Sequence, residues 1–143
     1  MTRFTDTNRE QFEQFKSLDR NSPINMINLV QFHDVAQYPA EHPLAADALT
    51  GAQAYKNYGA ASGPIMQRVG GKIIWRGDFD LTLIGDASEV WDAMFIVQYP
   101  TAAAFLEMVT NPEYQRAVVH RQAAVLNSRL IRSRPLEVSE TFE

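Results

Sequence analysis

Apolar residues recur along the chain with the two spacings that distinguish helices from strands. The helical spacing first joins three residues near the start of the chain, Phe12, Phe15 and Leu18. It predicts a short amphipathic helix that Asp6 or Thr7 could cap, because both side chains can accept hydrogen bonds from the first turn. The next segment, Ile24–Phe32, has the sequence INMINLVQF and is dense in apolar residues, which predicts the first core strand. Residues 34–49 contain two prolines and are expected to form a loop.

A second helix is expected to start near Thr50 and to run towards Val69. The pair Gly63-Pro64 should kink or break it, because proline has no N–H to donate to the preceding turn. The pair at 70–71 is Gly-Gly, which is typical of the end of a helix.

Strand-like segments follow the second helix. Residues 72–86, KIIWRGDFDLTLIGD, predict strand on both sides of Gly77-Asp78, as one long bent strand or as two short ones. Residues 91–100, WDAMFIVQYP, predict another strand that stops at its proline. Thr101 can then cap a helix, and Pro112 suits the first position of the next one.

That next helix is expected to reach about Asn127, and SRLIRSR, residues 128–134, predicts the last strand. The order is then β-α-β-β-α-β, an α+β ferredoxin-like arrangement with an antiparallel sheet. We expect one domain over residues 1–143, made of an N-terminal helical extension (1–22), a ferredoxin-like core (23–134) and a polar tail (135–143). Helices cover one face of such a sheet, so a second copy of the chain is expected to cover the other.

Composition narrows the class of protein. Hydrophobic residues make up 45% of the chain and charged residues 21%, a globular balance. A net charge of −4 gives no basic face for nucleic acid or for an anionic membrane. The chain has no cysteine, no apolar run long enough to span a membrane and no signal-peptide pattern at its start. We expect a soluble, cytoplasmic protein.

Arg121 lies in the middle of the apolar stripe of the last predicted helix. At 100° per residue it falls within about 60° of Ala117, Ala124 and Ser128. A charge on that stripe is costly unless it is paired and hydrogen-bonded. Three readings stay open: a structural arginine held by a carboxylate or by backbone carbonyls, an anion-recognising group in a pocket, or a side chain that reaches water.

Other polar residues interrupt the apolar faces and are candidates for binding a substrate. The tyrosines in these positions are Tyr55, Tyr58 and Tyr114, and the amides are Asn28 and Gln98. Tyrosines beside small residues such as Gly59 and Ser62 are typical of a mostly apolar ligand site, although ordinary core packing explains each of them as well. Asp92 is a possible charge partner for Arg121 or Arg129.

His120 lies at the edge of the same stripe and is the candidate general base, with a structural role as the alternative. Ligand types for a metal gather at His33, Asp34, Glu41 and His42, but their spacing matches no metal motif, and no metal site is expected. Nucleotide and phosphate loops and nucleophile elbows are missing from the sequence, and no cofactor is expected. A haem reading would need an axial ligand, for which His33 or His120 could only be guessed.

Five blocks together resemble a known family: INMINLVQF, GAQAYKNYG, GGKIIWRG, EVWDAMFIVQYPTAAAFLEMV and NPEYQRAVVHRQAAVLNSRLI. Over roughly residues 24–131 the chain is similar to the domain-of-unknown-function 1330 family. The resemblance implies the dimeric α/β-barrel superfamily, in which ferredoxin-like subunits face each other across a two-fold axis. The family has no established reaction, so it implies no catalytic set. Its recurrent positions correspond here to Asn28, Tyr55, Gly71, Trp91, Asp92, Tyr114, His120 and Arg121.

These observations predict a homodimer that binds a small carboxylate or phenolic ligand in an anion-recognising pocket. It could be a cofactor-independent enzyme, resembling the monooxygenases or isomerases of the superfamily, in which Arg121 holds an oxygen, a tyrosine orients the ligand and His120 moves a proton. The alternatives are a non-catalytic ligand binder and a purely structural homodimer, because a fold alone does not decide function.

Overall fold

A computed structural model describes residues 2–143 of the chain. It places the helices and strands as α1 (Arg9–Ser17), β1 (Ile24–Phe32), a short 3-10 helix (Ala45–Asp47), α2 (Gly51–Arg68), β2 (Lys72–Gly77), β3 (Ala93–Tyr99), α3 (Ala102–Thr110), α4 (Pro112–Ala124) and β4 (Val125–Ser133). Within these residues, no helix is both long and apolar enough to cross a membrane.

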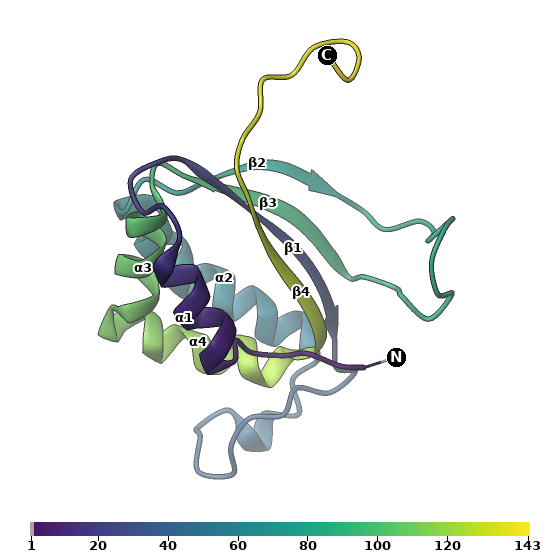
Figure 1. The fold of residues 1–143 in the computed structure, drawn as a ribbon. Helices are drawn as coiled ribbons and strands as arrows, with labels where there is room; N and C mark the ends of the chain where they lie inside the picture. Colours follow the sequence, from purple (N-terminus) through teal and green to yellow (C-terminus); the bar gives the residue numbers. More distant parts are fainter. Residues whose placement is uncertain (1) are drawn as a thin grey trace.

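The four strands form one sheet in the order β2-β3-β1-β4, and all neighbouring strands are antiparallel. Helix α2 connects β1 to β2, and α3 with α4 connects β3 to β4, so the order β-α-β-β-α-β is confirmed. Figure 1 shows the helices gathered on one side of the curved sheet, with α1 in front of them. The predicted α+β ferredoxin-like fold with an extra N-terminal helix is therefore confirmed.

The two faces of the sheet differ in what covers them. On the covered face, Ile24, Met26 and Val30 of β1 are buried against the helices together with Val97 and Tyr99 of β3. The alternate residues of each strand project from the open face. The strand pairing places six large apolar side chains next to one another on that face: Ile27, Leu29, Trp75, Met94, Ile96 and Ile131. The core of this chain therefore lies on the helix side of the sheet alone.

Helix α2 corrects one expectation, because it passes through Pro64 without a break. Pro64 and Ala60, whose carbonyl loses its partner, are both exposed, so water can bind that carbonyl. The start of the helix agrees with the prediction: Thr50 forms a capping box with Gln53. Helix α1 begins later than predicted, because Asn8 rather than Asp6 or Thr7 is its cap.

The segment after β2 is also different from the prediction. β2 ends at Gly77, and residues 78–92 form a loop. Three apolar residues of this loop are almost fully exposed, namely Leu81, Leu83 and Ile84. Their strand-like pattern has no surface of this chain to pack against, and strand formation depends on such packing more than on intrinsic propensity.

Helix α4 ends at Ala124 and β4 begins at once at Val125, so the predicted helix to Asn127 was too long. The carbonyls of Ala123 and Ala124 accept hydrogen bonds from the backbone N–H groups of Gln37 and His33, both at 2.8 Å. These loop contacts satisfy the last carbonyls of the helix and free the next residues to pair with β1. Ser128 therefore lies on β4 and not on the helical stripe of Arg121.

Candidate functional site

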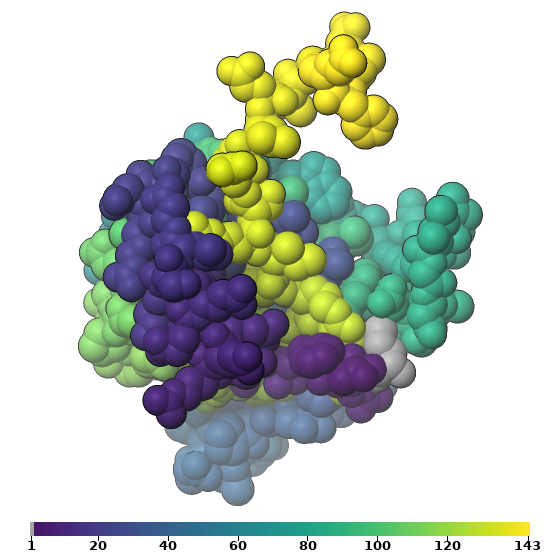
Figure 2. Space-filling model, in the orientation of Figure 1, coloured from purple at the N-terminus to yellow at the C-terminus, as the bar shows by residue number. Residues whose placement is uncertain are grey.

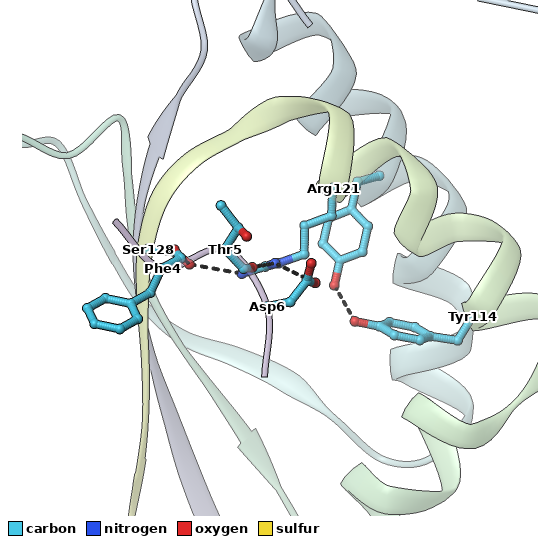
Figure 3. A network of polar contacts seen from close by, with 7 residues as sticks. Phe4, Thr5, Asp6, Tyr114, Arg121 and Ser128 are labelled. Carbon is cyan, nitrogen blue, oxygen red and sulfur yellow. Dashed lines mark hydrogen bonds and ion pairs between the residues drawn. The ribbon is translucent and has the colours of Figure 1, made fainter. Parts of the chain in front are cut away.

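Arg121 points from α4 towards the N-terminal segment (residues 2–6). Its guanidinium donates to the backbone carbonyl of Thr5 and to the Ser128 hydroxyl at 3.3 Å, and it lies 3.8 Å from a carboxylate oxygen of Asp6. Figure 3 shows these partners converging on the guanidinium from the terminal segment and from β4. The side chain is only 15% exposed, so the charge is largely removed from water and is held by hydrogen bonds and one carboxylate.

The N-terminal segment lies across β4 and is itself exposed. The N–H of Phe4 donates to Asn127 Oδ1 at 3.0 Å, and the carbonyl of Phe4 accepts from Ser128 Oγ at 2.8 Å. The ring of Phe4 lies 4.9 Å from the guanidinium carbon of Arg129. Figure 2 shows the segment on the molecular surface beside β4. A small number of polar contacts therefore holds the segment over Arg121.

The three predicted tyrosines lie in a row near Arg121. The ring of Tyr55 lies 5.4 Å from that of Tyr58, and the hydroxyls of Tyr58 and Tyr114 are hydrogen-bonded at 2.8 Å. Burial is the main cause that raises the pKa of Tyr55 and of Tyr114, the neighbouring Tyr58 adds to it, and the positive charge of Arg121 partly offsets it. Tyr55 and Tyr114 are therefore neutral hydroxyls that donate and accept hydrogen bonds at physiological pH.

The two predicted amides lie on opposite faces of the sheet. Asn28 is on the covered face, where its Nδ2 donates to the Met26 carbonyl at 3.0 Å. Gln98 is on the open face, where its Nε2 donates to Asn25 Oδ1 at 3.2 Å. Asn28 thus shares the tyrosine side of the sheet, whereas Gln98 belongs to the face that the helices leave open.

His120 makes its contacts away from Arg121. Its Nδ1 is 2.6 Å from the hydroxyl of Tyr38, and its ring lies edge-on to His42 with centroids 5.8 Å apart. Burial, and then the neighbouring His42, lower the pKa of His120. A shallow groove of about 340 Å³ beside it is also lined by Ile65, Glu113 and other residues of α2 and α4, but not by Arg121.

The structure therefore brings Arg121 and the tyrosines together and separates His120 and Gln98 from them. In the part of the chain that the structure describes, Asp92 forms no ion pair with Arg121 or Arg129. Its carboxylate instead accepts a hydrogen bond from the N–H of Phe32, the last residue of β1, at 2.8 Å. Arg129 instead lies between the rings of Phe4 and Trp91. Among residues 2–143, no three His, Asp or Glu side chains come together in a group that could hold a metal.

The helical spacing placed Ser128 near Arg121, but the two partners in the N-terminal segment, Thr5 and Asp6, were missed. Asp6 had the features of a helix cap, and the carbonyl of Thr5 has no side-chain signature. Both residues are more than a hundred positions away from Arg121 in the chain, so no local pattern could have joined them. Tyr38, the partner of His120, lies in the loop for which the sequence offered no element.

The chain matches one known protein family and a solved structure of high sequence identity. The family model of a domain of unknown function, DUF1330, matches residues 44–132. A protein of unknown function from Rhodopseudomonas palustris is 50% identical, with 96% of this chain and 100% of that chain covered and a TM-score of 0.88 in its crystal structure. A search of curated proteins found no match. The resemblance to the DUF1330 family is thereby confirmed.

More distant structures share the fold alone. An uncharacterised NIPSNAP-like domain protein from Burkholderia xenovorans has a TM-score of 0.52 at 15% identity, with 85% of this chain and 91% of that chain covered. A hypothetical protein from Arabidopsis thaliana has a TM-score of 0.51 at 12% identity, with 86% of this chain and 96% of that chain covered.

Proposed function

We propose that this chain, which belongs to the DUF1330 family, binds a small organic carboxylate at Arg121 and acts as a homodimer. One observation carries the proposal: among residues 2–143, the one carboxylate paired with this largely buried guanidinium is that of Asp6, which comes from the exposed N-terminal segment. A ligand carboxylate that replaced Asp6 would meet the same guanidinium.

The partners of Arg121 divide into a permanent one and exchangeable ones. Ser128 belongs to β4 and stays with the sheet, whereas Thr5 and Asp6 belong to the segment at the surface. Each hydrogen bond that holds such a segment contributes a net stabilisation of only about 1 kcal/mol, because water competes for the same groups. A carboxylate can form two parallel hydrogen bonds with a guanidinium, which favours its exchange for the single contact of Asp6 at 3.8 Å.

The tyrosines indicate the rest of the ligand. Behind Arg121, the rings of Phe32, Tyr55, Tyr58 and Tyr114 follow one another with neighbouring centroids 4.9–6.2 Å apart. Such a wall favours a flat or apolar ligand body, and the neutral hydroxyls can bind its polar substituents. A phenolic or otherwise aromatic carboxylate fits both parts of the site.

Binding without catalysis is the reading we favour. The hydrogen-bond and ring partners of His120 are Tyr38 and His42, and none of them is a partner of Arg121. A cofactor-independent monooxygenase or isomerase would need an acid–base group beside the bound ligand. The purely structural reading stays as the second candidate, because the contacts to Thr5, Asp6 and Ser128 already satisfy the guanidinium.

The homodimer rests on the open face of the sheet. Its apolar side chains, among them Ile27, Leu29 and Ile96, are only partly buried in a single chain, although strands that are apolar on both sides are typical of sheets covered on both faces. A second copy offers the same apolar face and closes the assembly by a two-fold axis. Light scattering at micromolar concentration is expected to give the mass of a dimer, and a monomeric mass would refute this part of the proposal.

Thermal unfolding in the presence of benzoate, hydroxybenzoates and aliphatic carboxylates tests the binding site. A ligand that binds only the folded state stabilises it by about 2.7 kcal/mol at a hundred times its Kd. We expect aromatic carboxylates to raise the Tm of the wild type and of Asp6→Asn, more strongly in the variant because the competing carboxylate is gone. Arg121→Met should lose the response.

Matched outcomes separate the two candidates. If no carboxylate raises the Tm of the wild type or of Asp6→Asn, and Arg121→Met unfolds far below both, Arg121 is structural. If the ligands act equally on Arg121→Met, they bind elsewhere and the proposed site is wrong.

A further inference from the structure

The C-terminal tail (residues 135–143) is apolar at alternate positions but touches little of its own chain. Leu136 is 83% exposed and Val138 97%. Within residues 2–143, the hydrogen bonds of the tail join its own residues, such as Ser139 and Thr141. Figure 1 and Figure 2 show the tail leaving the body beyond the end of β4. Large apolar side chains at such positions indicate a surface that receives them.

The pattern of the tail is that of a strand without a sheet. The run after Arg134 reads Pro-Leu-Glu-Val-Ser, in which apolar and polar residues alternate and the proline stands at the start, where a strand tolerates it. Its charged residues are all acidic: Glu137, Glu140 and Glu143. The tail therefore combines a period-two apolar pattern with a negative charge.

The outer edge of β2 has the complementary properties. β2 is an edge strand that pairs with β3 only, so among residues 2–143 its other side has no strand beside it. Ile73, Ile74 and Trp75 are between 44% and 47% exposed. The charged residues of β2 are Lys72 and Arg76, both basic. An exposed apolar edge without a neighbouring strand is a site for strand addition.

The proposed homodimer, on which this inference rests, would bring the two segments together if its two-fold axis ran parallel to the strands. When two sheets face each other across a two-fold axis parallel to their strands, the order of the strands is inverted from one sheet to the other. The β4 edge of one copy then lies opposite the β2 edge of its partner. The register places Ser133, the last residue of β4, level with Lys72, the first residue of β2. The tail would therefore start beside the first residue of β2 of the other copy and turn back there to run along its outer edge.

We propose that the tail of each copy adds as a strand to the outer edge of β2 of the partner copy. Leu136 and Val138 then pack with the apolar residues of β2, and Glu137 and Glu140 lie near Lys72 and Arg76. The exchange would supply the backbone hydrogen bonds that the β2 edge lacks within one chain.

Thiol cross-linking between different copies tests this exchange directly, because the natural chain has no cysteine. Two single-cysteine variants, Ile74→Cys and Val138→Cys, are made with tags of different mass, mixed, left to exchange subunits and treated with a short bis-maleimide. The cross-linked heterodimer is expected at about tenfold or more over the control mixture, since tethered groups meet at effective concentrations near the millimolar range. The control pairs Val138→Cys with Gln14→Cys, an exposed position on α1.

A second measurement uses the chain ended at Arg134. We expect its dimer Kd, measured by analytical ultracentrifugation, to rise about tenfold or more, because the apolar side chains of the tail are no longer buried. If the wild type is dimeric but the mixed single-cysteine variants give no cross-link above the control, the tail exchange alone is overturned. An unchanged Kd of the shortened chain overturns it as well. A monomeric wild type overturns the homodimer as well.

Discussion

Both faces of the sheet carry large apolar residues, but the helices cover only one of the two faces. In β1, Ile24 and Met26 are buried under the helices, whereas Ile27 and Leu29, each three residues further along, project from the open face. A strand that is apolar on both sides is typical of a sheet that is covered on both sides. The difference therefore teaches that the chain itself makes one layer over the sheet, and that the other face is left for the proposed second copy to cover.

The largest effect on stability is expected from a matched pair of substitutions in β1, one on each face of the sheet. Ile24→Ala removes a fully buried side chain and should lower the free energy of unfolding by about 2–4 kcal/mol, because it leaves a cavity in the core. Ile27→Ala on the open face is the control and should cost less within a single chain. Urea unfolding at low protein concentration measures both, and equal losses would contradict the distinction between the faces.

A charge on the open face should prevent the proposed dimer from forming without unfolding the single chain. Ile27 lies between Ile96 and Ile131 in the register, so Ile27→Asp would bury a carboxylate between two apolar sheets. We expect the variant to have a monomeric mass at micromolar concentration and an unchanged far-ultraviolet circular dichroism spectrum. A dimer of normal stability in this variant would show that the open face is not the interface.

The smallest effect is expected from His120, which lies on the helix side of the sheet, far from the open face. Burial and then His42 lower the pKa of His120 in the folded state, so the folded protein binds fewer protons there than the unfolded chain does. The contribution of this group to stability is present above the pKa of the unfolded state, about 6.5, and is lost as the pH falls through the lower folded value.

Replacing His120 should therefore flatten the pH dependence slightly. Urea midpoints of the wild type and of His120→Gln are compared at pH 7.5 and pH 5.5, and the wild type is expected to lose more stability on acidification. If the variant lost more, the pKa of His120 would have to be raised by folding. The test also measures whether the contact between His120 and Tyr38 holds the loop of residues 34–49 on α4.

Much of the fold could be predicted from the sequence, because strands and helices repeat locally. β1 has the bounds that its apolar run predicted, and Thr50, Thr101 and Pro112 begin their helices as their chemistry indicates. The errors fall where tertiary contacts overrule local preference. Pro64 stays within α2 because its side of the helix faces water. Residues 78–92 form a loop in which Leu81, Leu83 and Ile84 are 72–93% exposed, so these side chains have no packing that would favour a strand.

The candidate site was predictable only in part. Arg121 and the tyrosines stand out because polar groups on an apolar stripe need partners, and the structure brings Arg121, Tyr55 and Tyr114 together. His120 is next to Arg121 in sequence, yet its partners lie in a different loop, because adjacent residues of a helix point about 100° apart.

By itself the sequence determined the order of the elements, the class of the fold and the residues that could not be left without partners. The tertiary structure alone decided which partners they found. Periodicity and capping act within a few residues and can therefore be read from the local sequence. Thr5 and Asp6, in contrast, meet Arg121 only because the N-terminal segment lies on β4, the strand that follows α4. The open face follows from the same cause, since the number of layers on a sheet is set by what packs on it and not by the strand pattern.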